Sequence, residues 1–209
     1  MLQEISPGRR FVTPDLFLDH YVLEIARAFD TIDRAQFDLA VFILTDALDR
    51  DATIFSCGNG GSAAIANHMV CDYQKGLSSD THLRPRVVSL SSNAEVITAV
   101  SNDIGFAEVF AFPLRLHARS GDVLVTISSS GNSEDIVRAL EAASELKMKT
   151  VALTGFDGGR SRAMADAAIH TAAYNYGVVE DVHHTCMHVL AQFLRHRIIP
   201  AEMLSSCQF

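Results

Sequence analysis

TIFSCGNGGSAA, residues 53–64, joins an apolar run to a glycine-rich turn and then to small residues with helical spacing. A second segment of the same kind, DVLVTISSSGNS at residues 122–133, carries serines where the first has glycines. Each segment predicts a strand, a tight turn and the beginning of a helix, where free backbone N–H groups and the positive end of the helix dipole attract anions. Two such units in one chain predict a site for a phosphorylated small molecule.

Strand-like and helix-like segments alternate along the chain from Ala52 onward. Strands are expected at Thr53–Cys57, Arg86–Leu90, Asp122–Ile127, Thr150–Thr154 and Ala167–Thr171. Helices are expected at Ser62–Gln74, Asn93–Asn102, Ala107–Ala118, Glu134–Lys147, Ser161–Ala165 and Val179–Ile199, with Pro113 kinking or breaking the third of them. This alternation predicts an α/β fold with a mostly parallel sheet covered on both faces. Ligands bind such sheets at the carboxyl ends of the strands, where both turns fall.

The segment before the first strand, residues 14–49, has helical spacing in two pieces. Asp30 and Thr31 are candidates to cap the second piece. Both apolar stripes are wide, which favours packing on the sheet on one side and on a partner subunit on the other. We therefore expect an N-terminal helical segment at 1–50, one α/β domain at 51–200 and a C-terminal tail at 201–209.

The composition limits the class of partner and the compartment. A formal net charge of −8 over 209 residues argues against nucleic acid or an anionic membrane as a partner. The four cysteines form no CxxC pair, which is typical of proteins in a reducing cytosol. No apolar run is long enough to span a bilayer, and the residues before Phe11 include no hydrophobic signal core. A soluble cytoplasmic protein is expected.

The second turn is the richer of the two in hydroxyl groups. Ser128, Ser129, Ser130 and Ser133 offer several donors to one phosphate at the beginning of a helix. The alternative is a flexible serine and glycine loop that binds nothing, which is less favoured because strand and helix adjoin the loop directly. Neither turn matches a nucleotide-binding motif.

Two helices carry histidines and carboxylates at helical spacing. His68 and Asp72 lie four residues apart, so they share one face as metal ligands, an acid–base pair or a surface hydrogen bond. Glu180, His184 and His188 follow one another at the same spacing near the C-terminus, with Asp181 and His183 beside them. Histidines and carboxylates in this pattern suit zinc or another divalent ion, and a solvated helix face is the alternative. From the residues alone, His184 with His188 is the preferred ligand pair.

Taken in order, these segments resemble the sugar isomerase (SIS) domain family, and most closely its phosphoheptose isomerase branch. The resemblance rests on GNGGSAA with a following histidine, on ISSSGNS, on LEAASELKMKTVALTGFDGG and on a terminal helix with EDVH and a later histidine. It implies a single SIS domain with a five-stranded parallel sheet flanked by helices. It also implies a homotetramer with active sites at subunit interfaces and the N-terminal helices in the assembly core.

The resemblance also assigns site residues by position. The sugar-phosphate site would be lined by Asn59, Gly60, Ser62, Asn93, Ser128, Ser129, Ser130 and Ser133. A zinc ion, one per subunit, would be bound by His68, Asp72, Glu180 and His188. Asp72 and His188 would be the catalytic acid–base residues, although one side chain cannot be a zinc ligand and a free base simultaneously.

The chain departs from the family pattern at the site. Asp72 stands where the family has a glutamate, so its carboxylate is displaced by about 1.5 Å unless the backbone compensates, which matters for catalytic positioning. Glu180 stands where the family has a glutamine and adds a negative charge. Glu180 and His188 are eight residues apart, about 12 Å along a helix, which makes a shared ion difficult. Asn93 and Gly177 replace aspartates that relatives often carry near the substrate.

The expected reaction is aldose–ketose isomerisation of a phosphorylated sugar through an enediol. The resemblance points to sedoheptulose 7-phosphate and D-glycero-D-manno-heptose 7-phosphate as the sugars. Two alternatives stay open. One is a non-catalytic SIS module that binds a sugar phosphate or a protein, as in the factor that associates with the bacterial replication initiator. The other is an isomerase of a different phosphosugar.

Overall fold

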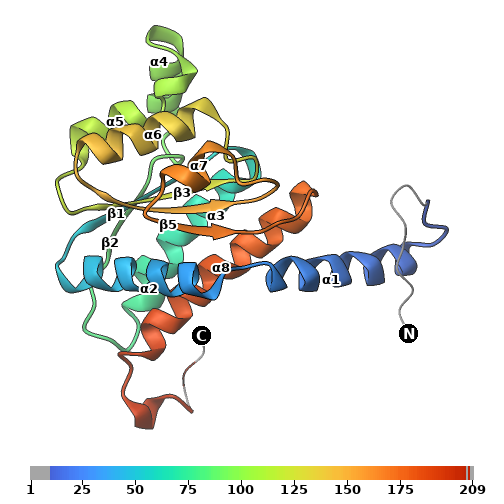
Figure 1. The fold of residues 1–209 in the computed structure, drawn as a ribbon. Helices are drawn as coiled ribbons and strands as arrows, with labels where there is room; N and C mark the ends of the chain where they lie inside the picture. The colour runs from blue at the N-terminus through green and yellow to red at the C-terminus, as the bar shows by residue number, and fades with distance from the viewer. Residues whose placement is uncertain (1–9, 206, 208–209) are drawn as a thin grey trace.

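The computed structural model describes residues 10–205 and 207, and it has the predicted α/β fold in three layers (Figure 1). The strands are Thr53–Gly58 (β1), Arg86–Ser89 (β2), Val123–Ser128 (β3), Lys149–Thr154 (β4) and Ala167–His170 (β5). The α-helices are Pro14–Asp30 (α1), Arg34–Asp49 (α2), Gly60–Cys71 (α3), Ala94–Asp103 (α4), Ala111–His117 (α5), Glu134–Glu145 (α6), Gly159–Met164 (α7) and Tyr176–His196 (α8). A π-helix at Asp72–Leu77 (η1) extends α3, and 3₁₀ turns occupy Phe106–Glu108 (η2) and Ala201–Met203 (η3).

The sheet is parallel throughout and has the strand order β2-β1-β3-β4-β5. Its central strand, β3, is buried along its whole length, which explains the uninterrupted apolar run in the sequence. Helices α2, α3 and α8 cover one face, α5 and α6 cover the other, and α4 lies beyond α5 and α6 (Figure 1). Because all strands run the same way, the turns after β1 and β3 meet at one edge of the sheet.

Helix ends explain where the structure differs from the expected boundaries. Asp33 caps α2, since its Oδ1 accepts from the Ala35 N–H at 2.9 Å, so the prediction of Asp30 and Thr31 as the cap is wrong. Thr31 instead ends α1 by donating to the Ala28 carbonyl. Asn175 caps α8, which therefore begins three residues before the expected Val179. The expected helix at 107–118 is divided into η2 and α5, and Pro113 lies in the first turn of α5, just after the break.

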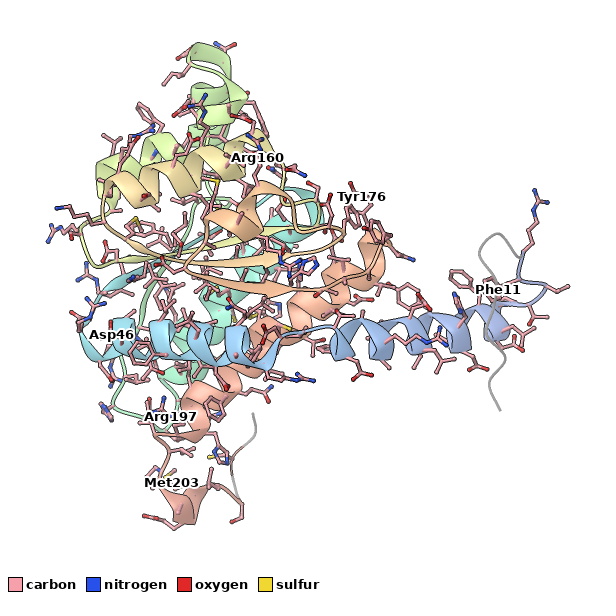
Figure 2. All side chains as sticks on the ribbon, viewed as in Figure 1. Phe11, Asp46, Arg160, Tyr176, Arg197 and Met203 are labelled. Atoms are coloured by element: carbon pink, nitrogen blue, oxygen red, sulfur yellow. The ribbon has the colours of Figure 1, made fainter. Side chains whose placement is uncertain are left out.

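Helix α1 extends beyond the three layers, and Phe11 lies near its far end (Figures 1 and 2). Its second half packs on α8, where the Tyr21 hydroxyl donates to Asp181 at 2.7 Å. Part of its surface carries exposed apolar side chains, which are Leu16, Phe17, Leu18 and Val22. Residues 1–9 of the expected N-terminal segment, and residues 206, 208 and 209 of the expected tail, lie outside the described residues.

Candidate functional site

The first turn is shaped by glycines that bring α3 close to the sheet. A Cβ at Gly58 would lie 2.7 Å from the carbonyl of Ser62, and Gly60 has φ +54°. Only glycine fits these two backbone positions without strain. The turn therefore delivers the N-terminus of α3, with its free N–H groups, to the carboxyl edge of the sheet. Ser62, in the first helical turn, is buried.

The second turn is held just as closely. Gly131 has φ +62°, and a Cβ there would lie 2.0 Å from the Gly158 carbonyl oxygen. The Ser128 hydroxyl accepts from the Gly131 N–H at 3.2 Å, and the Ser130 hydroxyl accepts from the Asn132 N–H at 3.2 Å. The Ser129 hydroxyl is buried and has no hydrogen-bond partner among the described residues. A buried donor without a partner is costly, which favours a ligand atom as its partner.

A side-chain hydrogen bond ties the two turns together. The Asn59 amide donates to Asp135, in the first turn of α6, at 2.7 Å. Asp135 is 2% exposed, and burial raises the pKa of its carboxyl group although the Asn59 amide acts in the opposite direction. Sequence reasoning missed Asp135, because nothing in the pattern after the serines distinguishes it from an ordinary first-turn carboxylate.

The remaining predicted ligand-binding residues lie at the same edge of the sheet. Ser133 occupies the N-cap position of α6, but its side chain makes no capping hydrogen bond. Asn93 caps α4 by accepting from the Val96 N–H at 3.0 Å, so its side chain is already used. The preceding loop joins the first turn through Ser91, which bonds both the N–H and the carbonyl of Gly58.

Helices α3 and α8 run side by side in the same direction, with contacts between residues 116 positions apart. His184 lies against His68, His188 against Asp72, and Arg195 against Ser79. Both helices begin at the carboxyl edge of the sheet, so moving along the pair means moving away from the turns. Ten residues separate Ser62 from Asp72, which is about 15 Å of helical rise.

Four side chains meet in the middle of this helix pair and form what we call the histidine cluster: His68, Asp72, His184 and His188. Asp72 Oδ2 lies 2.6 Å from His188 Nδ1, and Asp72 Oδ1 lies 3.2 Å from His68 Nε2. His184 Nε2 lies 3.2 Å from His68 Nδ1. Burial lowers the pKa of His184, and the neighbouring imidazoles of His188 and His68 lower it further. The neutral imidazole thus favoured is the form that binds metal ions.

The donor set of the histidine cluster fits a divalent metal ion. Ligand atoms of His68, His184 and His188 all lie within 4.8 Å of one another. Two nitrogens bound to zinc at about 2.1 Å in a tetrahedral site lie about 3.4 Å apart, close to the His68–His184 separation of 3.2 Å. Imidazoles with a carboxylate suit zinc among the common ions.

Glu180, the fourth ligand implied by the family resemblance, lies elsewhere. A Cβ at Gly61 would be 2.3 Å from Glu180 Oε2, so this carboxylate packs against the beginning of α3. His184, which the sequence pattern paired with His188, occupies the cluster in place of Glu180. The sequence could not choose between them, because both lie on the same face of α8 one helical turn apart.

Asp72 lies where the helix geometry changes. It is the first residue of η1, in which the backbone widens from an α-helix to a π-helix, and such segments are frequent at functional sites. Beyond Asp72 and His188 opens a cavity of about 870 Å³, whose walls also include Lys75, Gln192 and Arg195. Tyr176 and Met203, labelled in Figure 2, mark the start of α8 and the turn beyond its end, and the cavity lies toward Met203.

Comparisons with known proteins agree with this architecture. The family model of the SIS domain matches residues 19–155. A phosphoheptose isomerase of Helicobacter pylori (strain P12) is 34% identical over 165 residues, covering 75% of this chain and 82% of the relative. One from Vibrio parahaemolyticus is 37% identical over 162 residues, covering 77% and 83%. The solved phosphoheptose isomerase of Neisseria gonorrhoeae superposes with a TM-score of 0.79 at 30% identity, covering 87% and 96%.

Proposed function

The chain belongs to the SIS domain family, and from this premise we propose that it interconverts sedoheptulose 7-phosphate and D-glycero-D-manno-heptose 7-phosphate. The observation that carries the proposal is the Asp72–His188 pair, 2.6 Å apart, on two helices that both begin at an anion-binding edge. Relatives that are 34–37% identical over most of the chain bear the name phosphoheptose isomerase.

The two turns bind the phosphate. Backbone N–H groups at the beginnings of α3 and α6 point toward the sheet edge and favour a dianion through both helix dipoles. The unpartnered Ser129 hydroxyl and the uncapped Ser133 hydroxyl add donors from side chains. With a net charge of −8 on the chain, this local field must supply the attraction.

Asp72 and His188 move the protons of the isomerisation. Asp72 takes a proton from C1 of the ketose while His188 delivers one to O2, which gives the enediol. His188 then takes the proton of O1 while Asp72 returns its proton to C2, so no atom is gained or lost. The short contact between the two side chains orients the imidazole for these transfers.

The histidine cluster also holds the divalent ion of the proposed enzyme, with zinc as the favoured ion. His68 and His188 are the ligands on which the resemblance and the geometry agree, and Asp72 touches both of them. When bound, the ion would polarise the sugar carbonyl as a Lewis acid, a role that His188 would otherwise serve by donating a proton.

The proposed assembly is a homotetramer. The exposed apolar face of α1, together with the exposed Phe42 on α2, supports it, because apolar patches of this kind mark interfaces. Light scattering of the purified protein tests the number of chains per particle. In the part of the chain that the structure describes, no helix is long and apolar enough to cross a membrane.

Turnover of sedoheptulose 7-phosphate, with and without added zinc, tests the activity. Absence of turnover at saturating substrate in both conditions contradicts the proposal. A panel of pentose, hexose and heptose phosphates in the same assay then distinguishes the alternatives. A clear preference for a shorter sugar would identify a different phosphosugar isomerase, and binding without turnover of any sugar would identify a non-catalytic module.

A further inference from the structure

The histidine cluster contains one imidazole more than the ligand set implied by family resemblance. We propose that His184, and not Glu180, completes the metal centre of this chain together with His68 and His188. The proposal deepens the proposed function, because it concerns the same site, but it is argued from the geometry of α3 and α8 and tested by metal binding.

The geometry of His184 is that of a ligand. Its Nε2 lies 3.2 Å from His68 Nδ1, and its ring stacks on that of His188 with centroids 4.7 Å apart and planes 19° apart. The plane of the His68 ring makes an angle of 74° with the His184 ring and 87° with the His188 ring. The corresponding centroid distances are 4.8 and 4.9 Å. Three rings whose nitrogens converge on one point leave room for a shared ion there, and imidazole nitrogens are good zinc ligands.

Glu180 is held away from that point. Its carboxylate lies against Gly61, seven residues before His68, or about 10 Å of rise along α3. Glu180 is also attached to α8 four residues before His184, which is about one helical turn or 6 Å along the axis. Joining the cluster would require the side chain to leave the Gly61 backbone and turn along the helix axis, whereas His184 is already in place.

The exchange alters the charge of the centre. Three neutral imidazoles would leave the two positive charges of a bound ion offset by Asp72 alone, the only carboxylate that pairs with a histidine of the cluster among the described residues. A glutamate ligand together with Asp72 would offset both positive charges. A bound ion would therefore keep a net positive charge, which would strengthen its attraction for the oxygen atoms of an anionic sugar.

Zinc binding to the metal-stripped protein tests the assignment. Affinity is measured by competition with a chromophoric chelator for the wild type, His184→Gln and Glu180→Gln. We expect His184→Gln to weaken zinc binding at least tenfold and Glu180→Gln to change it less than threefold. His184 and Glu180 are both only half-buried on α8, so circular dichroism should show both variants folded.

X-ray absorption of the zinc-loaded protein gives a second readout, the number of imidazole ligands. Three are expected in the wild type and in Glu180→Gln, and two in His184→Gln. The proposal is overturned if Glu180→Gln loses zinc while His184→Gln retains it, or if the wild type binds no zinc. Because neither readout uses turnover, a protein that binds zinc as proposed but fails to isomerise sedoheptulose 7-phosphate would refute the proposed function alone.

Discussion

The beginning and the middle of the α3–α8 helix pair are built by different means. At the sheet edge, the turns owe their shape to the backbone, because glycines at 58 and 131 allow contacts that any Cβ would prevent. In the histidine cluster, backbone shape matters less, and the site exists because side chains 116 positions apart meet across two helices. The difference teaches that the proposed anion binding is a local property of short segments, whereas the proposed chemistry depends on the register between two helices.

Removing the proposed catalytic imidazole should separate the two regions most strongly. His188→Gln is expected to lower kcat by about 10²–10⁴-fold, since it removes the proposed acid–base group. Its affinity for inorganic phosphate should stay within about threefold of the wild type. The turns lie at the beginning of the helix pair, away from His188. Steady-state kinetics and calorimetric phosphate binding measure the two quantities. His82→Gln, at an exposed histidine outside the cluster, is the control and should change neither.

Distorting the backbone of the second turn should have the opposite signature. Gly131→Ala places a Cβ 2.0 Å from the Gly158 carbonyl at a positive φ, so we expect a loss of about 3 kcal/mol in the free energy of unfolding. Phosphate binding should fail with it, while zinc binding in the cluster persists wherever the variant remains folded. Denaturant titration with calorimetry measures both.

Two other glycines calibrate that result. In Gly60→Ala the new Cβ would contact no atom, but the backbone has φ +54°. Strain alone should therefore lower the free energy of unfolding by about 1 kcal/mol. Gly76→Ala has neither crowding nor a positive φ and should be neutral or slightly stabilising, because alanine favours helices. Equal losses in all three variants would contradict the view that close backbone contact shapes the turn.

The same contrast explains how far the sequence alone could go. Strands and turns are local, so the apolar runs and the residues 58–62 and 128–133 sufficed to predict the parallel sheet and its ligand-binding edge. Helix caps depend on single side chains, and Asp33 took the place expected of Asp30 and Thr31. The choice between Glu180 and His184 lay beyond local reasoning, because it depends on which α8 residue meets His68 once both helices have packed on the sheet.

Deleting one hydroxyl at the turn tests binding with little structural change. Ser129→Ala should weaken phosphate binding about tenfold, the cost of one lost hydrogen bond to a charged group. The ligand-free protein should unfold at the same temperature or slightly higher, because a buried hydroxyl without a partner has been removed. Thr126→Val is the matched control, since its hydroxyl is also buried and unpartnered but lies within β3. A Ser129→Ala protein with unchanged phosphate affinity would exclude this hydroxyl from the binding site.

The smallest expected effect concerns the charge that joins the two turns. Burial raises the pKa of Asp135, so between the ordinary value of 3.8 and the raised value the folded protein retains a proton that the unfolded chain has lost. The wild type therefore loses stability as pH rises through this window, and above it the cost of the buried charge is fully present. Asp135→Asn keeps an acceptor for the Asn59 amide and removes that cost. Its unfolding temperature should rise relative to the wild type as pH increases through the acid range, and then level off.

Asp166 provides the control of opposite sign for this prediction. Burial acts in the same direction there, but hydrogen bonds from Lys149 and Thr150 outweigh it and lower the pKa of Asp166. The wild type gains stability from this carboxylate above the ordinary pKa and loses it as pH falls toward the lowered value. Asp166→Asn should therefore become less stable relative to the wild type as pH rises, the reverse of Asp135→Asn. If both variants drift in the same direction, the pH dependence reflects overall charge and not the burial of Asp135 between the turns.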